Sequence, residues 1–388
     1  MKRSPLINIF LIVFIDLVGF GMMIPILPYY AKFFGASATM LGVLMMSYSG
    51  MQFLFSPLWG RLSDRLGRRP VLLTCILGIG LSMTVLGAAK SLVWLFAGRL
   101  LAGLFGANIS AASAYIADVT PPEKRAKGMG LIGAAFGLGF LFGPALGGVL
   151  AQWGYGTVAW TVAILALFNF IFALFTLKEP NLSETTRAEH RSHFNKQQWW
   201  QIVAEPKTGM PIVLFFLVTL GIAQMETAFA LFLLARFGLG ATQAGMILAA
   251  MAVVMVIVQG GAIGKLVHYF GEPKLVLFGT TFMALALAAA SFSIDLKFFI
   301  VAALFHSLGY GVTNPSLLSL VSRNAQAGGQ GATMGVYQSA GSLARIVGPL
   351  LAGLFFDHAG IGSPFLIASG FFVMALFLSI TKSESFSV

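Results

Sequence analysis

The segment GMGLIGAAFGLGFLFGPALGGVL, residues 128–150, contains the repeat that decides the fold. It aligns without gaps with TMGVYQSAGSLARIVGPLLAGLF, residues 333–355, at an offset of 205 residues. In this alignment the pair Gly143-Pro144 coincides with Gly348-Pro349. Internal repeats of this kind build two pseudo-symmetric halves in many membrane proteins. We therefore expect the chain to consist of two related halves.

The composition places these halves in a membrane. Of the 388 residues, 58% are hydrophobic and 10% are charged, whereas soluble domains carry roughly 25% charged residues. Runs of about 20 apolar residues, the length needed to cross the hydrocarbon core, recur along the chain. We predict an all-α membrane protein with twelve transmembrane helices in two pseudo-symmetric six-helix bundles. The predicted spans are residues 6–30, 40–59, 70–90, 92–116, 127–151, 157–177, 209–234, 243–264, 274–293, 298–321, 331–356 and 361–381.

A long polar connection separates the two predicted bundles. It begins at Glu179-Pro180 and runs to Thr208, whereas most other connections are short. The sequence therefore predicts an N-terminal bundle over residues 1–178, a cytoplasmic linker over 179–208 and a C-terminal bundle over 209–388.

The basic residues orient the chain and explain its net charge of +11. With a cytoplasmic N-terminus, most of the 24 Lys and Arg residues fall at cytoplasmic helix ends. This distribution follows the positive-inside rule. We therefore expect both termini in the cytoplasm, no nucleic-acid partner, and a protein integral to the plasma membrane, the inner membrane of a bacterium. The residues on the far side are Lys32, Lys90, Arg236 and Lys297.

Three segments carry recognisable motifs. The loop GRLSDRLGRRP, residues 60–70, has a glycine-framed Asp followed by arginines. The others are GLGFLFGPALGG, residues 137–148, and DLVGFGMMIPILP, residues 16–28. Together they resemble the major facilitator superfamily, and in particular its twelve-helix drug:proton antiporter branch with the tetracycline and multidrug exporters. The resemblance implies the major facilitator fold and antiport.

The sequence departs from tetracycline exporters at acidic and basic positions. Their helix 8 histidine falls at Met255, and their helix 9 aspartate falls near Met283. Glu226 in the seventh span has no acidic counterpart in them. The resemblance therefore supports antiport more than it supports tetracycline as the substrate.

The resemblance also implies a cytoplasmic gate in the loop after the second span. Asp64 would meet the positive end of a helix from the other half, and Arg68 would pair with Asp118. In the second copy, GKLVHYFGEPK, residues 264–274, His268 replaces the acid, so that latch should be weaker. Alternatively, the arginines only fix the orientation of the chain. The expected gate residues are Gly60, Asp64, Arg65, Gly67, Arg68 and Asp118.

The fifth span contains the residues of the antiporter motif. Glycines four residues apart allow a neighbouring helix to approach closely, and Pro144 removes a backbone hydrogen bond and favours a bend. Packing alone explains this pattern, and the antiporter role comes from the resemblance. The motif residues are Gly139, Gly143, Pro144 and Gly147.

Four ionisable residues lie inside predicted spans, where a charge costs about 2.5–3.5 kcal/mol on insertion scales. They are Asp16, Arg99, Glu226 and Arg345. Asp16 and Arg99 lie at depths that differ by about 5 Å, and the superfamily fold brings their helices together, as it does those of Glu226 and Arg345. We expect each half to hold one carboxylate near one guanidinium, for proton coupling or substrate binding. Asp16 as a partner of its own backbone, and Glu226 as a structural partner of Arg345, are the alternatives.

Several classes of function lack their signatures. No GxxxxGK[ST] motif occurs, so energy should come from a gradient rather than from ATP. Cys75 is the single cysteine, which excludes an intramolecular disulfide and a thiolate metal cluster. His306 is as readily a satisfied polar residue between helices as a functional one. We expect no metal, no cofactor and no enzymatic activity.

The leading hypothesis is a proton-coupled antiporter that exports small amphipathic molecules by alternating access. Its expected partners are the small-molecule substrate, protons and the lipid bilayer, and we expect a monomer. The alternative is a dedicated metabolite carrier of the same fold, an exporter or symporter of a siderophore, a sugar or a similar solute. A membrane receptor or intramembrane enzyme would need a catalytic cluster that the spans do not contain.

Overall fold

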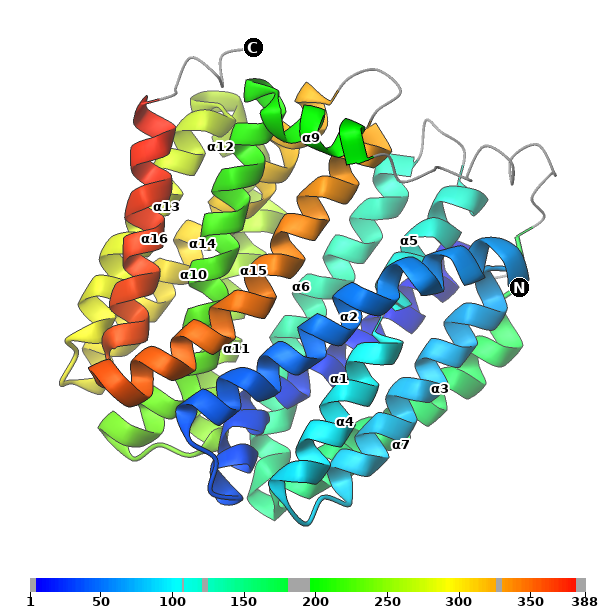
Figure 1. Ribbon diagram of the computed structural model, residues 1–388, viewed down its shortest axis with the longest axis horizontal. Coiled ribbons are helices and arrows are strands. Elements are labelled where there is room, and N and C mark those ends of the chain that lie inside the picture. Colours follow the sequence, from blue (N-terminus) through cyan, green and yellow to red (C-terminus); the bar gives the residue numbers. More distant parts are fainter. Residues whose placement is uncertain (1–4, 107, 121–124, 181–195, 326–329, 382–388) are drawn as a thin grey trace. The chain divides into compact units, whose positions relative to one another are not determined.

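The computed structural model describes residues 5–106, 108–120, 125–180, 196–325 and 330–381, and these residues form helices and no strands (Figure 1). Lipid offers no partner for backbone polar groups, so apolar runs become helices that satisfy their own backbone. In the first part of the chain the elements are α1 Pro5–Phe33, α2 Ala38–Leu66, α3 Arg68–Gly87, α4 Leu92–Phe105, α5 Asn108–Val119, α6 Arg125–Leu150, η2 Ala151–Trp153 and α7 Tyr155–Thr176. In the second part they are α9 Lys196–Ala204, α10 Pro206–Phe237, α11 Ala241–Ile257, η3 Val258–Ala262, α12 Ile263–Phe270, α13 Glu272–Ser291, α14 Leu296–Asn324, α15 Gln330–Ala359 and α16 Ser363–Thr381.

Eleven helices of the described residues are long and apolar enough to cross a membrane. They confirm an all-helical membrane protein. The predicted span 92–116 differs from the other spans, because α4 ends at Phe105 and α5 begins at Asn108. One predicted membrane crossing is therefore built from two short helices.

The chain folds into two compact units. Unit 1 contains residues 1–36, 47–193 and 241–249, and unit 2 contains residues 37–46, 194–240 and 250–388. The predicted division into residues 1–178, 179–208 and 209–388 stays a prediction, and much of that linker lies outside the described residues.

Each unit includes the first turns of one helix from the other half of the chain. In unit 1 the Thr242 hydroxyl, at the start of α11, donates to the Gly148 carbonyl of α6 over 2.7 Å. In unit 2 the Asp357 carboxylate of α15 accepts hydrogen bonds from the backbone N–H groups of Ala38 and Thr39, at the start of α2. The helix ends that begin α2 and α11 are thus fixed by polar contacts.

In unit 1, α1 packs against α6 through the glycines of the antiporter motif. A side chain added at Gly143 would place its Cβ 2.6 Å from the Cα of Gly21, and one added at Gly139 would place it 2.7 Å from the Leu17 side chain. A Cβ added at Gly147 would likewise overlap the backbone of Met22. Small residues therefore allow the two helix backbones to touch, which is how helices pack tightly in lipid.

In unit 2, α10 packs against α15 by the same device. A Cβ at Gly348 would lie 2.7 Å from the Ala223 side chain, and Ala344 and Ala352 of the same face are buried. Because Gly348 aligns with Gly143 in the sequence repeat, the two units use equivalent helix pairs.

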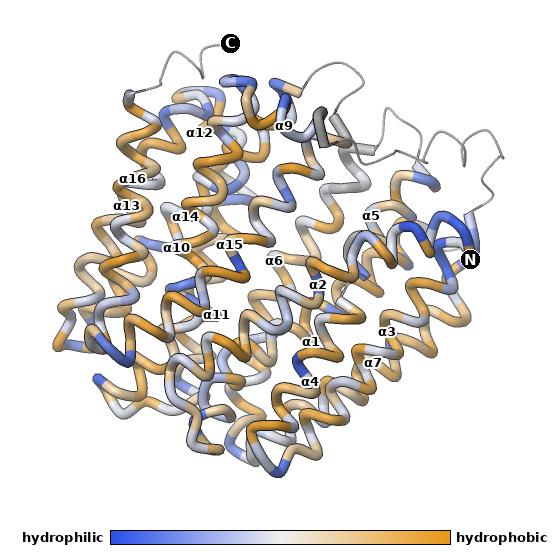
Figure 2. Tube along the Cα trace, viewed as in Figure 1, coloured by the Kyte–Doolittle hydropathy of each residue, from blue (hydrophilic) through white to orange (hydrophobic). Residues whose placement is uncertain are grey.

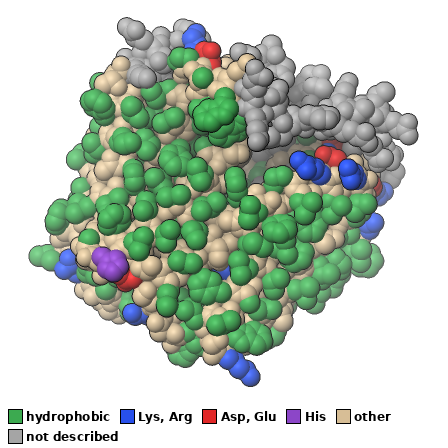
Figure 3. All heavy atoms as spheres, in the orientation of Figure 1, with side chains coloured by type: hydrophobic (Ala, Val, Ile, Leu, Met, Phe, Trp, Pro, Cys, Tyr) green, Lys and Arg blue, Asp and Glu red, His purple; other side chains and the backbone are tan. Residues whose placement is uncertain are grey.

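The outer surface of the helices is apolar. Hydrophobic residues predominate along the helical spans, whereas hydrophilic residues concentrate toward helix ends (Figure 2). The face drawn in Figure 3 is covered mainly by hydrophobic side chains, with few charged ones among them. Exposed Phe175, Ile164 and Phe377 are examples of side chains that suit a lipid environment.

Gly143→Ala should lower the stability of the protein because its methyl group would overlap the α1 backbone at Gly21. Overpacking typically costs about 1–3 kcal/mol. The measurement is the thermal unfolding temperature of the purified protein in detergent. Gly133→Ala, on the same helix, is the matched control, since the added Cβ would have no atom of another element within 4 Å. Equal unfolding temperatures for both variants would contradict the packing argument.

Candidate functional site

The carboxylate of Asp16 lies in the middle of α1 and is held by two amides. Asn108 Nδ2 donates to Asp16 Oδ2 over 2.7 Å, and Asn169 Nδ2 donates to Asp16 Oδ1 over 2.8 Å. Asn169 Nδ2 also donates to the Ile12 carbonyl over 3.0 Å. Asn169 is fully buried, whereas Asp16 is only half-buried. Two N–H donors stabilise the ionised carboxylate without neutralising its charge.

The expected facing pair of Asp16 and Arg99 is not formed. The Arg99 guanidinium lies over the Tyr48 ring, with its carbon 4.3 Å from the ring centroid. Arg99 is buried at 6% exposure, and its Nε has no hydrogen-bond partner within the described residues. The aromatic face thus provides the favourable contact that a carboxylate was expected to provide.

The junction of α4 and α5 is stabilised from α2. At the end of α4, the last carbonyl groups lack partners within the helix. Trp59 Nε1 donates to the Leu104 carbonyl, and Gln52 Nε2 donates to the Gly106 carbonyl, each over 2.6 Å. Asn108, which holds Asp16, is the first residue of α5. The interruption of the predicted span therefore adjoins the Asp16 site.

Arg68, the first residue of α3, forms the expected ion pair with Asp118 of α5. Arg68 Nε donates to Asp118 Oδ2 and Arg68 Nη1 donates to Asp64 Oδ1, each over 2.7 Å. The side chains of Arg68 and Asp118 are 5% and 1% exposed, and that of Asp64 is 34% exposed. We call these three residues the latch. Its gating role, and the contact of Asp64 with a helix of the other half, stay predictions.

A carboxylate that follows α7 in the sequence binds the backbone next to the latch. The Glu179 carboxylate accepts hydrogen bonds from the backbone N–H groups of Arg68 and Arg69 at the start of α3, over 2.6 and 2.9 Å. A negative charge is favourable at this positive helix end. Gly67 has a φ of 107°, and any side chain there would collide with Glu179. This explains why a glycine precedes α3.

The second copy of the loop has an ion pair of opposite polarity. Arg323 Nη1 donates to Glu272 Oε1 over 2.9 Å, and the Ser319 hydroxyl donates to the same oxygen over 3.0 Å. By the sequence offsets, Glu272 aligns with Arg68 and Arg323 aligns with Asp118. The Arg323 side chain is 52% exposed, so water and salt screen this pair more than the Arg68–Asp118 pair. Whether the second latch is weaker stays a prediction.

Glu226 and Arg345 lie in unit 2 within electrostatic range of each other, but no direct ion pair joins them in the part of the chain described here. Both side chains are half-buried. Tyr310 of α14 and Tyr337 of α15 adjoin the same charges, and the Tyr337 ring stacks on Phe215 of α10 at 3.7 Å. The cluster combines one carboxylate, one guanidinium and aromatic rings.

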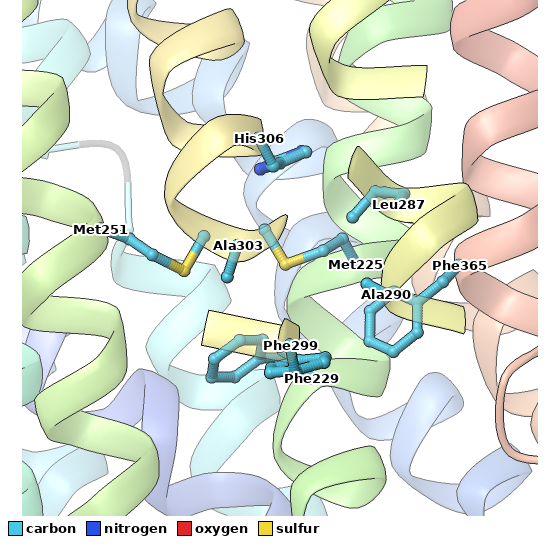
Figure 4. Close-up of a pocket in the computed structure, with 9 residues that line it drawn as sticks. All are labelled: Met225, Phe229, Met251, Leu287, Ala290, Phe299, Ala303, His306 and Phe365. Carbon is cyan, nitrogen blue, oxygen red and sulfur yellow. The ribbon is translucent and has the colours of Figure 1, made fainter. Parts of the chain in front are cut away.

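His306 of α14 lies at a small cavity inside unit 2 (Figure 4). The cavity has a volume of about 10 Å³, which is roughly enough for one water molecule. His306 is 2% exposed, and neither ring nitrogen has a hydrogen-bond partner among the described residues. The described side chains and backbone thus provide no partner for His306, and whether it is a satisfied polar residue or a functional one stays open. The cavity wall is otherwise apolar, with Met225, Met251 and Phe299 among its residues.

Comparison with known proteins identifies the family. The model of the Major Facilitator Superfamily matches residues 9–346 and 237–386. The chain belongs to the Major Facilitator Superfamily. It is 32% identical to the class E tetracycline resistance protein of Escherichia coli, over 97% of this chain and 95% of that protein. It is 31% identical to multidrug resistance protein 2 of Bacillus subtilis (strain 168), over 95% of this chain and 92% of that protein.

Solved structures agree with this membership. The human organic anion transporter MFSD10 (TETRAN) has a TM-score of 0.72 and 26% identity, over 97% of this chain and 99% of that one. A bacterial homologue of the human lysosomal transporter Spinster has a TM-score of 0.81 at 16% identity, over 99% of this chain and 97% of that one, which supports the fold alone. The major facilitator fold predicted from the sequence is thus confirmed, and the chain is a membrane-embedded transporter.

The amides that hold Asp16 in this superfamily member were not predicted from the sequence. Asn169 interrupts the apolar run TVAILALFNFIFALF, residues 161–175, and Asn108 interrupts the fourth predicted span. Lone amides in such runs are costly unless they find a partner, which is a signal that they line a polar site. Glu272 and Arg323 occupy the repeat positions of the ion pair in the first half. The pair was not predicted because its two charges are exchanged.

Arg68→Gln should strongly destabilise the protein, because it leaves the Asp118 carboxylate buried without its cation. Removing one partner of a buried pair costs about 3–5 kcal/mol. The measurement is the unfolding temperature in detergent, with exposed Arg61→Gln as the control. The double variant Arg68→Gln/Asp118→Asn should recover part of the loss. Additive losses from the two single changes would contradict a stabilising ion pair.

Proposed function

We propose that this transporter is a proton-coupled antiporter that exports small amphipathic molecules from the cytoplasm. The observation that carries the proposal is the Asp16 carboxylate, which lies in the middle of a membrane-spanning helix and is bound by two neutral amides. A carboxylate at this depth is costly, and no cation neutralises it among the described residues. Binding a proton removes that cost, so Asp16 is suited to load and release a proton during transport.

Similarity to the tetracycline and multidrug resistance proteins supports export of drug-like compounds. The cluster of Glu226, Tyr310 and Tyr337 supports aromatic, amphipathic substrates, because a half-buried carboxylate attracts cations and the rings provide apolar contact. We further propose a monomer in the bacterial inner membrane with both termini in the cytoplasm, as the distribution of basic residues predicts. Gating by the latch belongs to the same proposal.

A second candidate is a carrier dedicated to one solute class, organic anions. Buried Arg99, over the Tyr48 ring, offers a positive charge that no carboxylate neutralises within the described residues. The human organic anion transporter MFSD10 shares the fold at 26% identity. Proteoliposomes tested with tetracycline, the lipophilic cation ethidium and the anion fluorescein separate the two candidates. Proton-driven transport of several unrelated compounds supports the first, and transport of fluorescein alone supports the second.

Asp16→Asn should abolish proton-driven transport, because an amide cannot release a proton, while the protein still folds and binds ligand. The measurement is uptake of ethidium or tetracycline into inside-out membrane vesicles with an acidic lumen, together with the accompanying proton efflux. Asp295→Asn is the control, since Asp295 caps the start of α14 outside the helix. Wild-type gradient-driven uptake by Asp16→Asn would falsify its role in coupling.

Glu226→Gln should reduce uptake of ethidium at least tenfold and affect fluorescein much less, because the loss of a half-buried carboxylate weakens attraction for a cation. Arg345→Gln should have the opposite preference. Both are measured as initial rates in the same vesicles, normalised to the amount of folded protein. An equal loss for cation and anion in both variants would show that these residues do not select substrate charge.

A further inference from the structure

Helix α5 connects the two polar sites of unit 1. Its first residue, Asn108, donates to the Asp16 carboxylate, and near its other end Asp118 accepts from Arg68 in the latch. The separation of ten positions in the sequence corresponds to about 15 Å of helix. One short, continuous helix therefore touches the candidate proton site and the candidate gate.

Three features separate α5 from α4. Helix α4 ends at Phe105, and Gly106 turns back so that its N–H donates to the Gly103 carbonyl. The carbonyls of Leu104 and Gly106 bind Trp59 and Gln52 of α2. These carbonyls therefore depend on α2 rather than on α5, so they do not tie α5 to α4.

Protonation of Asp16 changes what holds α5. The ionised carboxylate accepts one amide hydrogen bond on each oxygen. The neutral acid carries a hydrogen of its own on one oxygen, and hydrogen bonds without a charge are about half as strong. Asn169 is fully buried and also donates to the Ile12 carbonyl. Loss of the charge weakens both amide hydrogen bonds, and the one from Asn108 is the one that joins α5 to α1.

We propose that α5 is a lever that couples the protonation of Asp16 to the latch, with Asn108 and Asn169 as the positioning residues that hold the ionised carboxylate. This inference rests on the proposed role of Asp16 in proton coupling. Ionised Asp16 holds α5 where Asp118 pairs with Arg68, and protonated Asp16 releases α5 and loosens the latch. By thermodynamic reciprocity, loosening the latch must in turn favour protonation of Asp16.

Few other titratable groups face Asp16 in the described part of the chain. The Cys75 thiol of α3 lies within electrostatic range of the carboxylate. Helix α5 carries Tyr115 and Asp118 toward its far end. The described side chains of α6 include no titratable group, and α7 has Tyr155 at its first position. Asp16 is therefore the group whose protonation the experiment should report, with Asp16→Asn as the check.

The test uses a reporter that needs no substrate. Leu66→Cys, 62% exposed at the end of α2 beside the latch, is labelled with a trifluoromethyl thiol reagent in lipid nanodiscs. The native Cys75 is fully buried and does not compete for label. Fluorine NMR spectra recorded from pH 4.5 to pH 8.5 give the populations of the closed and loosened latch. We expect a pH-dependent transition that Asp16→Asn abolishes, leaving the loosened state throughout.

Asn108→Ala should reduce the amplitude of this transition at least twofold and favour the loosened latch, because ionised Asp16 can no longer hold α5 through that hydrogen bond. Asn108→Gln, which keeps an amide donor, should recover part of the amplitude. Asn169→Ala removes the other donor and keeps Asn108, so it should move the midpoint upward by about one pH unit, and it provides a second variant if Asn108→Ala does not fold. Asp118→Asn should shift the midpoint in the same direction by a few tenths of a unit, although it lies about 15 Å away along α5.

Asn8→Ala is the matched control, because Asn8 makes a similar α1–α7 hydrogen bond, to the Thr176 carbonyl, that does not involve Asp16. The lever is overturned if the label shows no pH dependence. It is also overturned if Asn108→Ala leaves the amplitude, and Asp118→Asn the midpoint, where Asn8→Ala leaves them. A shifted midpoint combined with wild-type transport by Asp16→Asn would instead refute the proposed function and leave the lever intact.

Discussion

The structure depends on one constraint: polar and charged groups inside an apolar helix bundle must find partners there. Three charged side chains inside unit 1 have different kinds of partner. Asp16 is bound by two amides, Arg99 lies over a tyrosine ring, and Arg68 binds two carboxylates. Direct contact with carboxylates places Arg68 in a stable ion pair, whereas Asp16, whose partners are neutral, is suited to the change of protonation state that we propose. The difference in partners therefore separates structural charges from those suited to transport.

The backbone obeys the same constraint, and this explains why the helices pack as they do. Continuous helices satisfy their own polar groups, so glycine faces such as Gly139, Gly143 and Gly147 can bring α1 and α6 into backbone contact. Where the fourth predicted span is interrupted, side chains from α2 satisfy the exposed carbonyls. An interruption inside a membrane is tolerated only with such support. The helix can therefore break here because Gln52 and Trp59 lie opposite the exposed carbonyls.

The sequence predicted the features that follow from composition and repetition. Helical spans come from apolar runs, the close approach of a neighbouring helix to α6 and α15 follows from repeated small residues, and the Arg68–Asp118 contact came from the family resemblance. Which helix approaches was not predicted from these small residues. Contacts that depend on helix rotation were less accessible. Matching depths of Asp16 and Arg99 suggested a pair, but depth does not fix the direction of a side chain, and Asn108 and Asn169 occupy the place beside the carboxylate. The break at Phe105 has no proline to mark it.

The sequence repeat does not extend to the charges. Arg68 and Asp118 align with Glu272 and Arg323, so the ion pair is kept while its polarity is reversed. Each residue of a pair can change sign only if the other does, because an uncompensated buried charge is far more costly than an exchanged pair. The Asp16 position has no such freedom. Its partners are neutral amides, whereas Glu226, the acid inside a span of unit 2, lies near a cation. The two halves therefore share a scaffold and differ in how each one handles charge, in keeping with the proposed proton site in one half and the proposed substrate site in the other.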